Sequence, residues 1–189
     1  MLISAFNRLL DKLKEQQAEL SRAAHHDSLT GLPNRRLLAD RIKTALATAR
    51  RQNTRIALLF MDLDEFKPIN DTLGHEAGDK VLQLVARRLQ ASVRETDSVA
   101  RLGGDEFVIL MTNLGDDALT VTELLAEKIM TAIKAPFDLD GSPYQIGTSI
   151  GAAVGDGNQT EASLMRLADN LMYEAKAAGR GRYVVQRAG

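Results

Sequence analysis

The sequence contains no cysteine, which excludes disulfide bonds, thiol catalysis and cysteine-based metal sites and suits a reducing cytoplasm. No apolar run approaches the length of a membrane-spanning helix, and no stretch resembles a signal peptide. Neither sign of charge dominates, because 24 lysines and arginines oppose 25 aspartates and glutamates. The net charge of −1 argues against a broad nucleic-acid or membrane surface, although it leaves room for a local basic pocket. We therefore expect a cytoplasmic chain with no nucleic-acid partner and no direct membrane contact.

A phosphate-binding loop of the GxxxxGKS or GxxxxGKT type is also missing, so a switch-type GTPase is not expected. What is present is the composition of an ordinary globular protein, with 44% hydrophobic and 26% charged residues among 189. This length is enough for one domain with a sizeable core and an appendage.

The most informative stretch is Arg101-Leu-Gly-Gly-Asp-Glu-Phe107. Strand-like residues flank the two glycines, Gly103 and Gly104, so a tight β-hairpin with a two-residue Gly-Gly loop is predicted. A hairpin tip without side chains lets the backbone approach a phosphate or a flat base closely. The acids that follow, Asp105 and Glu106, could hold a cation beside such a ligand. Taken alone, an ordinary turn with a solvated acidic shoulder explains the stretch better than a binding site does.

A second acidic segment upstream favours a binding site over an ordinary turn. The apolar run Ile56–Met61 is typical of a central strand buried on both faces. It leads into Asp62 and Asp64, which alternation places on one face at the end of the strand. Buried acids are costly unless a cation or a donor compensates them. An acid-rich loop after a core strand is the structural alternative, but Asp62 with Asp105 supplies hard oxygen ligands suited to Mg²⁺ shared with nucleotide phosphates.

Four segments in order resemble the GGDEF family of bacterial diguanylate cyclases: Asp27–Arg35, Asp62–Asp79, Gly103–Phe107 and Tyr173–Arg180. Several ordered motifs are far more specific than any one of them. The resemblance implies a palm-like, ferredoxin-type nucleotide cyclase fold. The helix-and-hairpin pattern indicates the same α+β class, with a mostly antiparallel central sheet flanked by helices. The activity implied is condensation of two GTP into cyclic di-GMP and two pyrophosphates by a homodimer, with Mg²⁺ as cofactor and Mn²⁺ as an alternative.

The resemblance also implies roles for individual residues. The metal would lie on Asp62, the backbone carbonyl of Leu63, and Asp105. Glu106 would be the companion acid that assists metal binding or activates the attacking hydroxyl. How Asp105 and Glu106 divide these tasks is left open.

The substrate-binding residues that the resemblance implies are Asn70 and Asp79 for guanine, Lys67, Lys176 and Arg180 for phosphates, and Gly103 and Gly104 at the hairpin. A carboxylate accepts the paired N1–H and N2–H₂ donors of guanine, whereas adenine would leave a buried Asp79 unmatched. Lys176 and Arg180 are expected on one face near a helix C-terminus. Without the family context, helix capping would explain Asn70 and Asp79. Interaction with the helix dipole would explain Lys176 and Arg180.

A control element is expected at Arg94-Glu-Thr-Asp97, which has the spacing from Gly103 of the family's inhibitory product site. Arg94 could contact guanine O6 and N7 or a phosphate, and Asp97 could accept from the guanine N1–H and N2–H₂ groups. Cyclic di-GMP is therefore expected as both product and inhibitor. Lys128 stands where relatives often carry arginine. A lysine cannot make the bidentate contact to the bound product that an arginine makes, so the tightness of the inhibition is left open.

Residues 1–26 are expected to form a helical stalk or linker, and residues 27–189 the catalytic domain. A heptad seam runs through Leu2, Phe6, Leu9, Leu13, Gln16, Leu20 and Ala23. It favours a dimeric stalk over a helix packed on its own domain. Residues 5–10 resemble the end of a HAMP signalling module, so we expect the output end of a longer receptor anchored in the inner membrane. With so short a stalk, the dilute chain is expected to be largely monomeric.

Two other functions fit the same motifs. One is a non-catalytic sensor of GTP or cyclic di-GMP, against which the intact acids and basic residues argue. The other is a mononucleotide cyclase on a similar palm fold, which would release a cyclic monophosphate.

Overall fold

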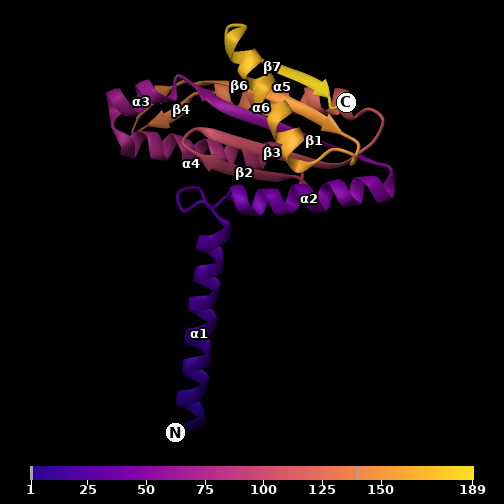
Figure 1. Cartoon of the computed structure of the whole chain (residues 1–189). Coiled ribbons are helices and arrows are strands. Elements are labelled where there is room, and N and C mark those ends of the chain that lie inside the picture. Colours follow the sequence, from indigo (N-terminus) through magenta and orange to yellow (C-terminus); the bar gives the residue numbers. More distant parts are fainter. Residues whose placement is uncertain (1, 140) are drawn as a thin grey trace.

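The computed structural model describes residues 2–139 and 141–189, without the side chains of residues 2–6, 9, 15, 18 and 20–22. A five-stranded sheet has the order β2-β3-β1-β6-β7 (Figure 1). Its strands are β1 (Arg55–Asp64), β2 (Ser98–Gly103), β3 (Glu106–Leu114), β6 (Gly147–Gly155) and β7 (Tyr183–Arg187). The helices are α1 (Leu2–His25), α2 (Arg35–Gln52), α3 (Phe66–Leu73), α4 (His75–Ser92), α5 (Ala118–Lys134) and α6 (Glu161–Ala177).

The sheet is mostly antiparallel, as predicted. Strand β1 lies between β3 and β6 and is antiparallel to both, and β2 is antiparallel to β3. Strand β7 is the exception, because it runs parallel to β6 after the crossover through α6. The order β2-β3-β1-β6 with α4 and α5 as crossovers is the ferredoxin-type arrangement, so the predicted fold class is confirmed.

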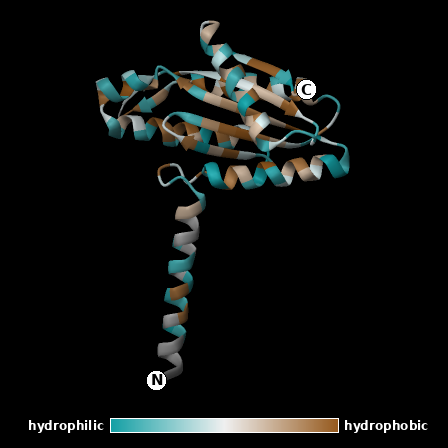
Figure 2. Cartoon of the chain, viewed as in Figure 1, coloured by the Kyte–Doolittle hydropathy of each residue, from teal (hydrophilic) through white to brown (hydrophobic). Residues whose placement is uncertain are grey.

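Strand β1 is central because both of its faces are apolar. Ala57, Leu59 and Met61 pack into the core on the side of α4 and α5. The intervening residues, which include Leu58 and Phe60, pack into a second core with residues of α2 and α6. Figure 2 shows hydrophobic residues concentrated on the strands, whereas the helices carry both hydrophobic and hydrophilic residues. The alternation continues to Asp62, which therefore belongs to the face that α6 covers.

Helix α1 stands away from the body of the domain (Figure 1). The alternative in which this helix packs along its own domain is therefore not seen. Leu13, on the predicted seam, is 53% exposed. The side chains of the seam residues Leu2, Phe6, Leu9 and Leu20 lie outside the described residues, as do several of the HAMP-like segment 5–10. In the part of the chain that is described, no helix is both long enough and apolar enough for a membrane crossing.

Asn34 joins α1 to the domain. Its Oδ1 accepts the backbone N–H groups of Arg36 and Leu37, each at 3.1 Å, so it caps α2. Its Nδ2 donates to the carbonyl of Ala24 at 3.0 Å, which links the same side chain to the end of α1. One residue thus fixes where the stalk helix leaves the domain.

The region 137–155 contains three strands. The short strands β4 (Phe137–Leu139) and β5 (Ser142–Tyr144) form a separate two-stranded sheet. The third, β6, belongs to the central sheet and lies against β1. Gly141, with a φ of 87°, turns the chain between β4 and β5.

Candidate active site

Three strands bring the predicted acids together at one end of the sheet. Asp62 of β1 has Glu106 of β3 as its Cα partner on one side and Ser149 of β6 on the other. Asp105 directly precedes Glu106 in the hairpin turn. Acids from two distant sequence motifs therefore become neighbours, as the sequence predicted.

The hairpin loop lies one residue later than predicted. Gly103 pairs with Glu106 as the last residue of β2, so the loop residues are Gly104 and Asp105. The register shifts between Arg101 and Gly103, where Gly103 takes a φ of 140°. Gly104 takes a φ of 52°, so a side chain at either glycine would be strained. The two glycines are needed to turn the chain, and the turn carries Asp105.

The electrostatics of this edge are unfavourable for carboxylates. Burial raises the pKa of Asp62, and the negative charges of Asp105 and Asp64 add to it, against the lowering effect of Lys176. Burial also raises the pKa of Glu106, with Asp62 as a further cause. Acids whose pKa values are raised by burial and by each other are typical of functional sites.

Lys176 of α6 reaches this edge. Its Nζ lies 2.7 Å from Oδ1 of Asp62, and the exposed fractions of the two side chains are 27% and 14%. The Lys176 ammonium therefore offsets part of the negative charge of Asp62. Arg180 does not share the helical face of Lys176, contrary to the prediction, because α6 ends at Ala177 and Arg180 lies in the following turn.

The residues at this edge fit a divalent cation. Asp62 and Asp105 are hard oxygen donors, and the negative charge of Asp105 helps to raise the pKa of Asp62. Across the described residues, no group of three or more histidine, cysteine or acidic side chains could hold a metal alone. The fit therefore requires further oxygen ligands, such as the Leu63 carbonyl and the phosphates of a nucleotide.

Arg101 fixes the hairpin tip from behind. Its Nε and Nη2 donate to the carbonyl of Gly104 at 3.0 and 2.7 Å, and its Nη1 donates to both oxygens of Asp27 at 2.8 and 3.0 Å. Burial raises the pKa of Asp27, but hydrogen bonds from Thr30 and Arg101 outweigh it and leave the pKa lowered. The segment that follows α1 is thereby connected to the glycine loop.

The predicted guanine readers lie on two adjoining helices. Asn70 is half-buried on α3, and Asp79 is exposed on α4. Gly78 of α4 makes room between them, because a Cβ there would overlap the Asn70 amide. Lys67, predicted to bind a phosphate, is exposed on α3.

The predicted inhibitory residues close a turn at the end of α4. Oδ2 of Asp97 accepts the backbone N–H of Arg94 at 3.1 Å, and the Arg94 side chain is exposed. Lys128 of α5 donates to the carbonyl of Ser92 at 2.7 Å. The three residues lie around one helix end, where Asp97 and Lys128 also have structural partners.

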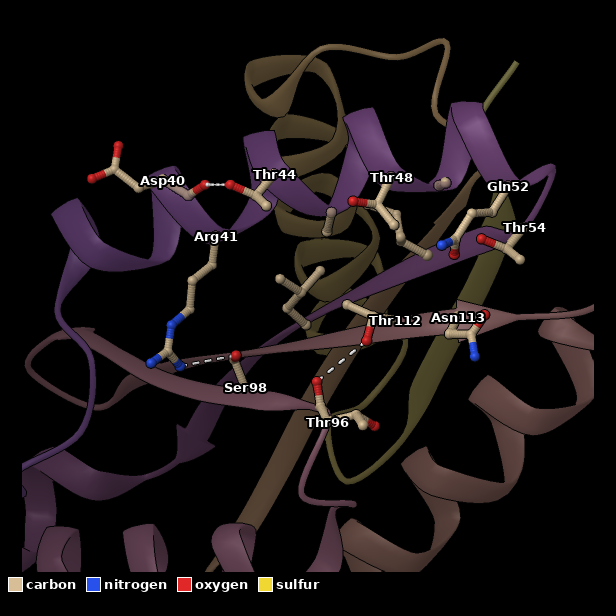
Figure 3. Close-up of a pocket in the computed structure, with 14 residues that line it drawn as sticks. Asp40, Arg41, Thr44, Thr48, Gln52, Thr54, Thr96, Ser98, Thr112 and Asn113 are labelled. Carbon is tan, nitrogen blue, oxygen red and sulfur yellow. Dashed lines mark hydrogen bonds between the residues drawn. The ribbon is translucent and has the colours of Figure 1, made fainter.

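A separate cavity of about 430 Å³ lies between α2 and strands β2 and β3 (Figure 3). Arg41 donates to Ser98 Oγ at 2.9 Å, and the Thr112 hydroxyl donates to the Thr96 carbonyl at 3.2 Å. Thr96 and Ser98 flank Asp97, so the cavity adjoins the Arg94–Asp97 turn. None of the acids at the end of β1 lines it. Its remaining polar lining includes Asp40, Thr44, Thr48, Gln52, Thr54 and Asn113.

Arg101, Asp27 and Gly78 lie within the motifs of the sequence, but the sequence predicts no role for them. A glycine inside a predicted helix, such as Gly78, can indicate a close contact with a neighbouring element, because glycine otherwise lowers the stability of the helix. The pairing of Arg101 with Asp27 has no such signal, since the residues are distant in sequence.

A family model described as "Diguanylate cyclase, GGDEF domain" matches residues 24–182. Among curated relatives, Diguanylate cyclase TpbB of Pseudomonas aeruginosa is 44% identical over 187 residues, covering 93% of this chain and 42% of the relative. The bifunctional diguanylate cyclase/cyclic di-GMP phosphodiesterase MucR of the same species is 47% identical over 178 residues, covering 93% of this chain and 25% of MucR. The chain thus spans less than half the length of either relative.

The solved structure of the coiled coil and GGDEF domain of DgcB from Caulobacter crescentus, in complex with c-di-GMP, superposes with a TM-score of 0.86. It is 28% identical, and the match covers 98% of this chain and 97% of DgcB. The fold, the motifs and the family match agree over most of the described residues. This chain belongs to the diguanylate cyclase, GGDEF-domain family.

Proposed function

We propose that this chain is a diguanylate cyclase that condenses two GTP into cyclic di-GMP and two pyrophosphates. The observation that carries the proposal is the meeting of Asp62 with Asp105 and Glu106 at one sheet edge, beside the Lys176 ammonium. The activities named for TpbB and MucR support the same reaction.

In each of the two condensation steps, a ribose 3′-hydroxyl oxygen forms a bond to the α-phosphorus of the other GTP. The bond from that phosphorus to the pyrophosphate oxygen breaks, and the hydroxyl proton passes to a base. Glu106 suits this role, because burial raises its pKa and makes it a better proton acceptor. Such transfers depend mainly on in-line positioning and charge neutralisation, which fixed side chains supply.

Asp62, the Leu63 carbonyl and Asp105 would hold Mg²⁺, or Mn²⁺ in its place. When bound, the cation neutralises phosphate charge and lowers the pKa of the attacking hydroxyl. Lys67, Lys176 and Arg180 would bind phosphates, and Lys176 already lies at the acids. Asn70 and Asp79 would bind guanine, and the bare backbone of Gly103 and Gly104 would let the nucleotide approach.

The product has twofold symmetry, so two chains would each present one GTP across a twofold axis. The projecting helix α1 supports this arrangement, with residues 1–26 as the stalk and 27–189 as the catalytic domain (Figure 1). In a longer receptor, a stalk could transmit a signal by changing the alignment of the two sites. We propose that this chain is the cytoplasmic output domain of such a receptor.

Cyclic di-GMP would also bind at Arg94 and Asp97 and inhibit the enzyme. The exposed Arg94 side chain supports this role. Asp97 would have to share or release its bond to the Arg94 backbone when it accepts from guanine. Product binding and the geometry of this turn would therefore be coupled.

The test is product analysis after incubation of the concentrated protein with GTP and Mg²⁺, beside an Asp105→Ala variant. We expect cyclic di-GMP from the intact protein and a loss of at least about 100-fold in the variant. A cyclic monophosphate would identify a mononucleotide cyclase instead. Guanine nucleotide binding with no product, even in an imposed dimer, would identify a sensor.

A further inference from the structure

The second acid of β1 has a different environment from the first. Asp64 is only 8% exposed, and Ser149 Oγ donates to its Oδ1 at 2.7 Å. The backbone N–H of Gly181 donates to its Oδ2 at 3.0 Å. Its Cα partner is Gly147, where a Cβ would come within 3.0 Å of Oδ2. The neighbouring strand thus leaves space for this carboxylate, and both of its oxygens are already used.

The turn that Asp64 contacts has a demanding backbone. Gly179, Arg180 and Gly181 take consecutive φ values of 116°, 59° and 56°. A non-glycine residue such as Arg180 is strained in the left-handed region, so the surroundings must hold it there. The N–H groups of Gly179 and Arg180 donate to carbonyls of α6 at 3.2 Å each. The N–H of Gly181 instead reaches across to the end of β1.

We propose that Asp64 is a positioning residue that fixes the turn 179–181 and thereby aims Arg180 at the phosphate end of the substrate. This inference rests on the proposed function, in which Arg180 binds phosphates of GTP that GMP lacks. A buried carboxylate requires donors, and a strained turn requires an acceptor for its free N–H. The single bond between Asp64 and Gly181 satisfies both needs and links the acid-bearing strand to the phosphate-binding turn.

A role for Asp64 as a metal ligand is the competing explanation. It would place Asp64 beside Asp62 in the cation site, and it would require the bonds to Ser149 and Gly181 to be given up. The two explanations differ in what a substitution changes. A positioning residue affects phosphate binding at any cation concentration, whereas a ligand affects the Mg²⁺ requirement.

The discriminating variant is Asp64→Asn. If the Asn oxygen keeps the bond from Ser149, the amide nitrogen faces the Gly181 N–H, and two donors oppose each other. Binding of α,β-methylene GTP, which cannot be cleaved, and of GMP would be measured by titration calorimetry. We expect the GTP analogue to bind about tenfold more weakly, which is the loss of about one charge-assisted hydrogen bond, and GMP to bind within about twofold of the original chain.

Ser149→Ala is the matched control, because it removes the other bond to Asp64 and leaves the Gly181 bond intact. We expect the preference for the GTP analogue over GMP to stay within about twofold in this variant. In an Arg180→Ala background, Asp64→Asn should cause no further loss, because the residue it positions is absent.

Additive losses in the double variant, equal losses for both nucleotides, or a raised Mg²⁺ midpoint would each overturn the positioning role. An original chain that prefers the GTP analogue while Asp64→Asn keeps that preference would contradict the inference alone. An original chain without any such preference would contradict the proposed function as well.

Discussion

The paired acids of β1 and β3 are held in surroundings that disfavour their charge. Asp62 and Glu106 are partly buried and face other carboxylates, and the pKa values of both are raised. Such an arrangement costs stability in the protein without a bound cation, and functional sites commonly carry this cost. The effect of this cost on the stability of the protein can be measured by substituting a single side chain.

The variant Asp62→Asn should gain thermal stability and lose cyclase activity. Burial raises the pKa of Asp62 above 3.8, so the folded chain binds more protons than the unfolded chain between the two values. The stability of the original chain should therefore rise as pH falls from neutral through the raised pKa, and then level off near 3.8. Melting temperatures across this range in EDTA would measure the slope, which should be shallower in Asp62→Asn.

The same variant should lose at least about 100-fold in activity with GTP, because a hard oxygen ligand is replaced by a weaker one. Asp116→Asn serves as the control, since Asp116 is a fully exposed acid paired loosely with Arg55 at 3.5 Å. Identical pH slopes for all three proteins would show that Asp62 carries no burial cost.

At the scale of elements, the hairpin tip depends on a residue that touches no substrate. Arg101 joins the Gly104 carbonyl to Asp27. The side chain of Arg101 is 10% exposed, and that of Asp27 is 17% exposed. A poorly exposed ion pair, in which Nη1 of Arg101 contacts both carboxylate oxygens of Asp27, is worth more than a surface ion pair. Asp105 lies next to Gly104, so a change in this contact reaches the acids.

Arg101→Lys should lower both stability and activity, because an ammonium cannot bridge a carboxylate and a carbonyl with parallel donors. We expect a loss of about 1–3 kcal/mol, or roughly 2–4 °C in melting temperature for each kcal/mol. Calorimetry and the cyclase assay would measure the two effects.

Arg41→Lys is a matched control, since Arg41 makes one exposed hydrogen bond from α2 to Ser98 of β2. Its effect should stay within about 0.5 kcal/mol. Equal effects of the two substitutions would mean that the hairpin tip does not depend on Arg101.

At the scale of the whole molecule, the domain and the projecting helix contribute differently. The domain positions one set of the proposed site residues, whereas the proposed product would require two nucleotides. Leu13 on α1 is 53% exposed and can be covered by a second copy of the helix. Three heptads make only a weak coiled coil, so association should depend on concentration.

The chain should be largely monomeric when dilute and become more active per molecule as its concentration rises. Sedimentation and specific activity, measured over the same concentrations, should change together. Fusion to a stable parallel dimeric coiled coil should remove the concentration dependence, because it raises the effective concentration of the two half-sites. A tight dimer in dilute solution without nucleotide would contradict the prediction.

The sequence alone determined the fold class and the position of the central strand. The apolar run before Asp62 predicted a central strand, and the helix-and-hairpin pattern predicted an α+β fold, because periodicity and turn residues are local properties. The ordered motifs predicted that Asp62, Asp105 and Glu106 belong to one site, because each motif is also a local pattern. Local pattern did not resolve the hairpin loop, where a register shift moved the turn to Gly104 and Asp105.

Only the tertiary structure decided which distant groups meet. Ser149 and Gly181 bind Asp64, Asp27 binds Arg101, and Lys176 reaches Asp62. These contacts depend on the sheet order and on where α6 ends, and neither is encoded in the spacing of the residues involved. A residue's type and its neighbours in sequence set what it can bond to, but its partners are chosen by how the strands and helices pack.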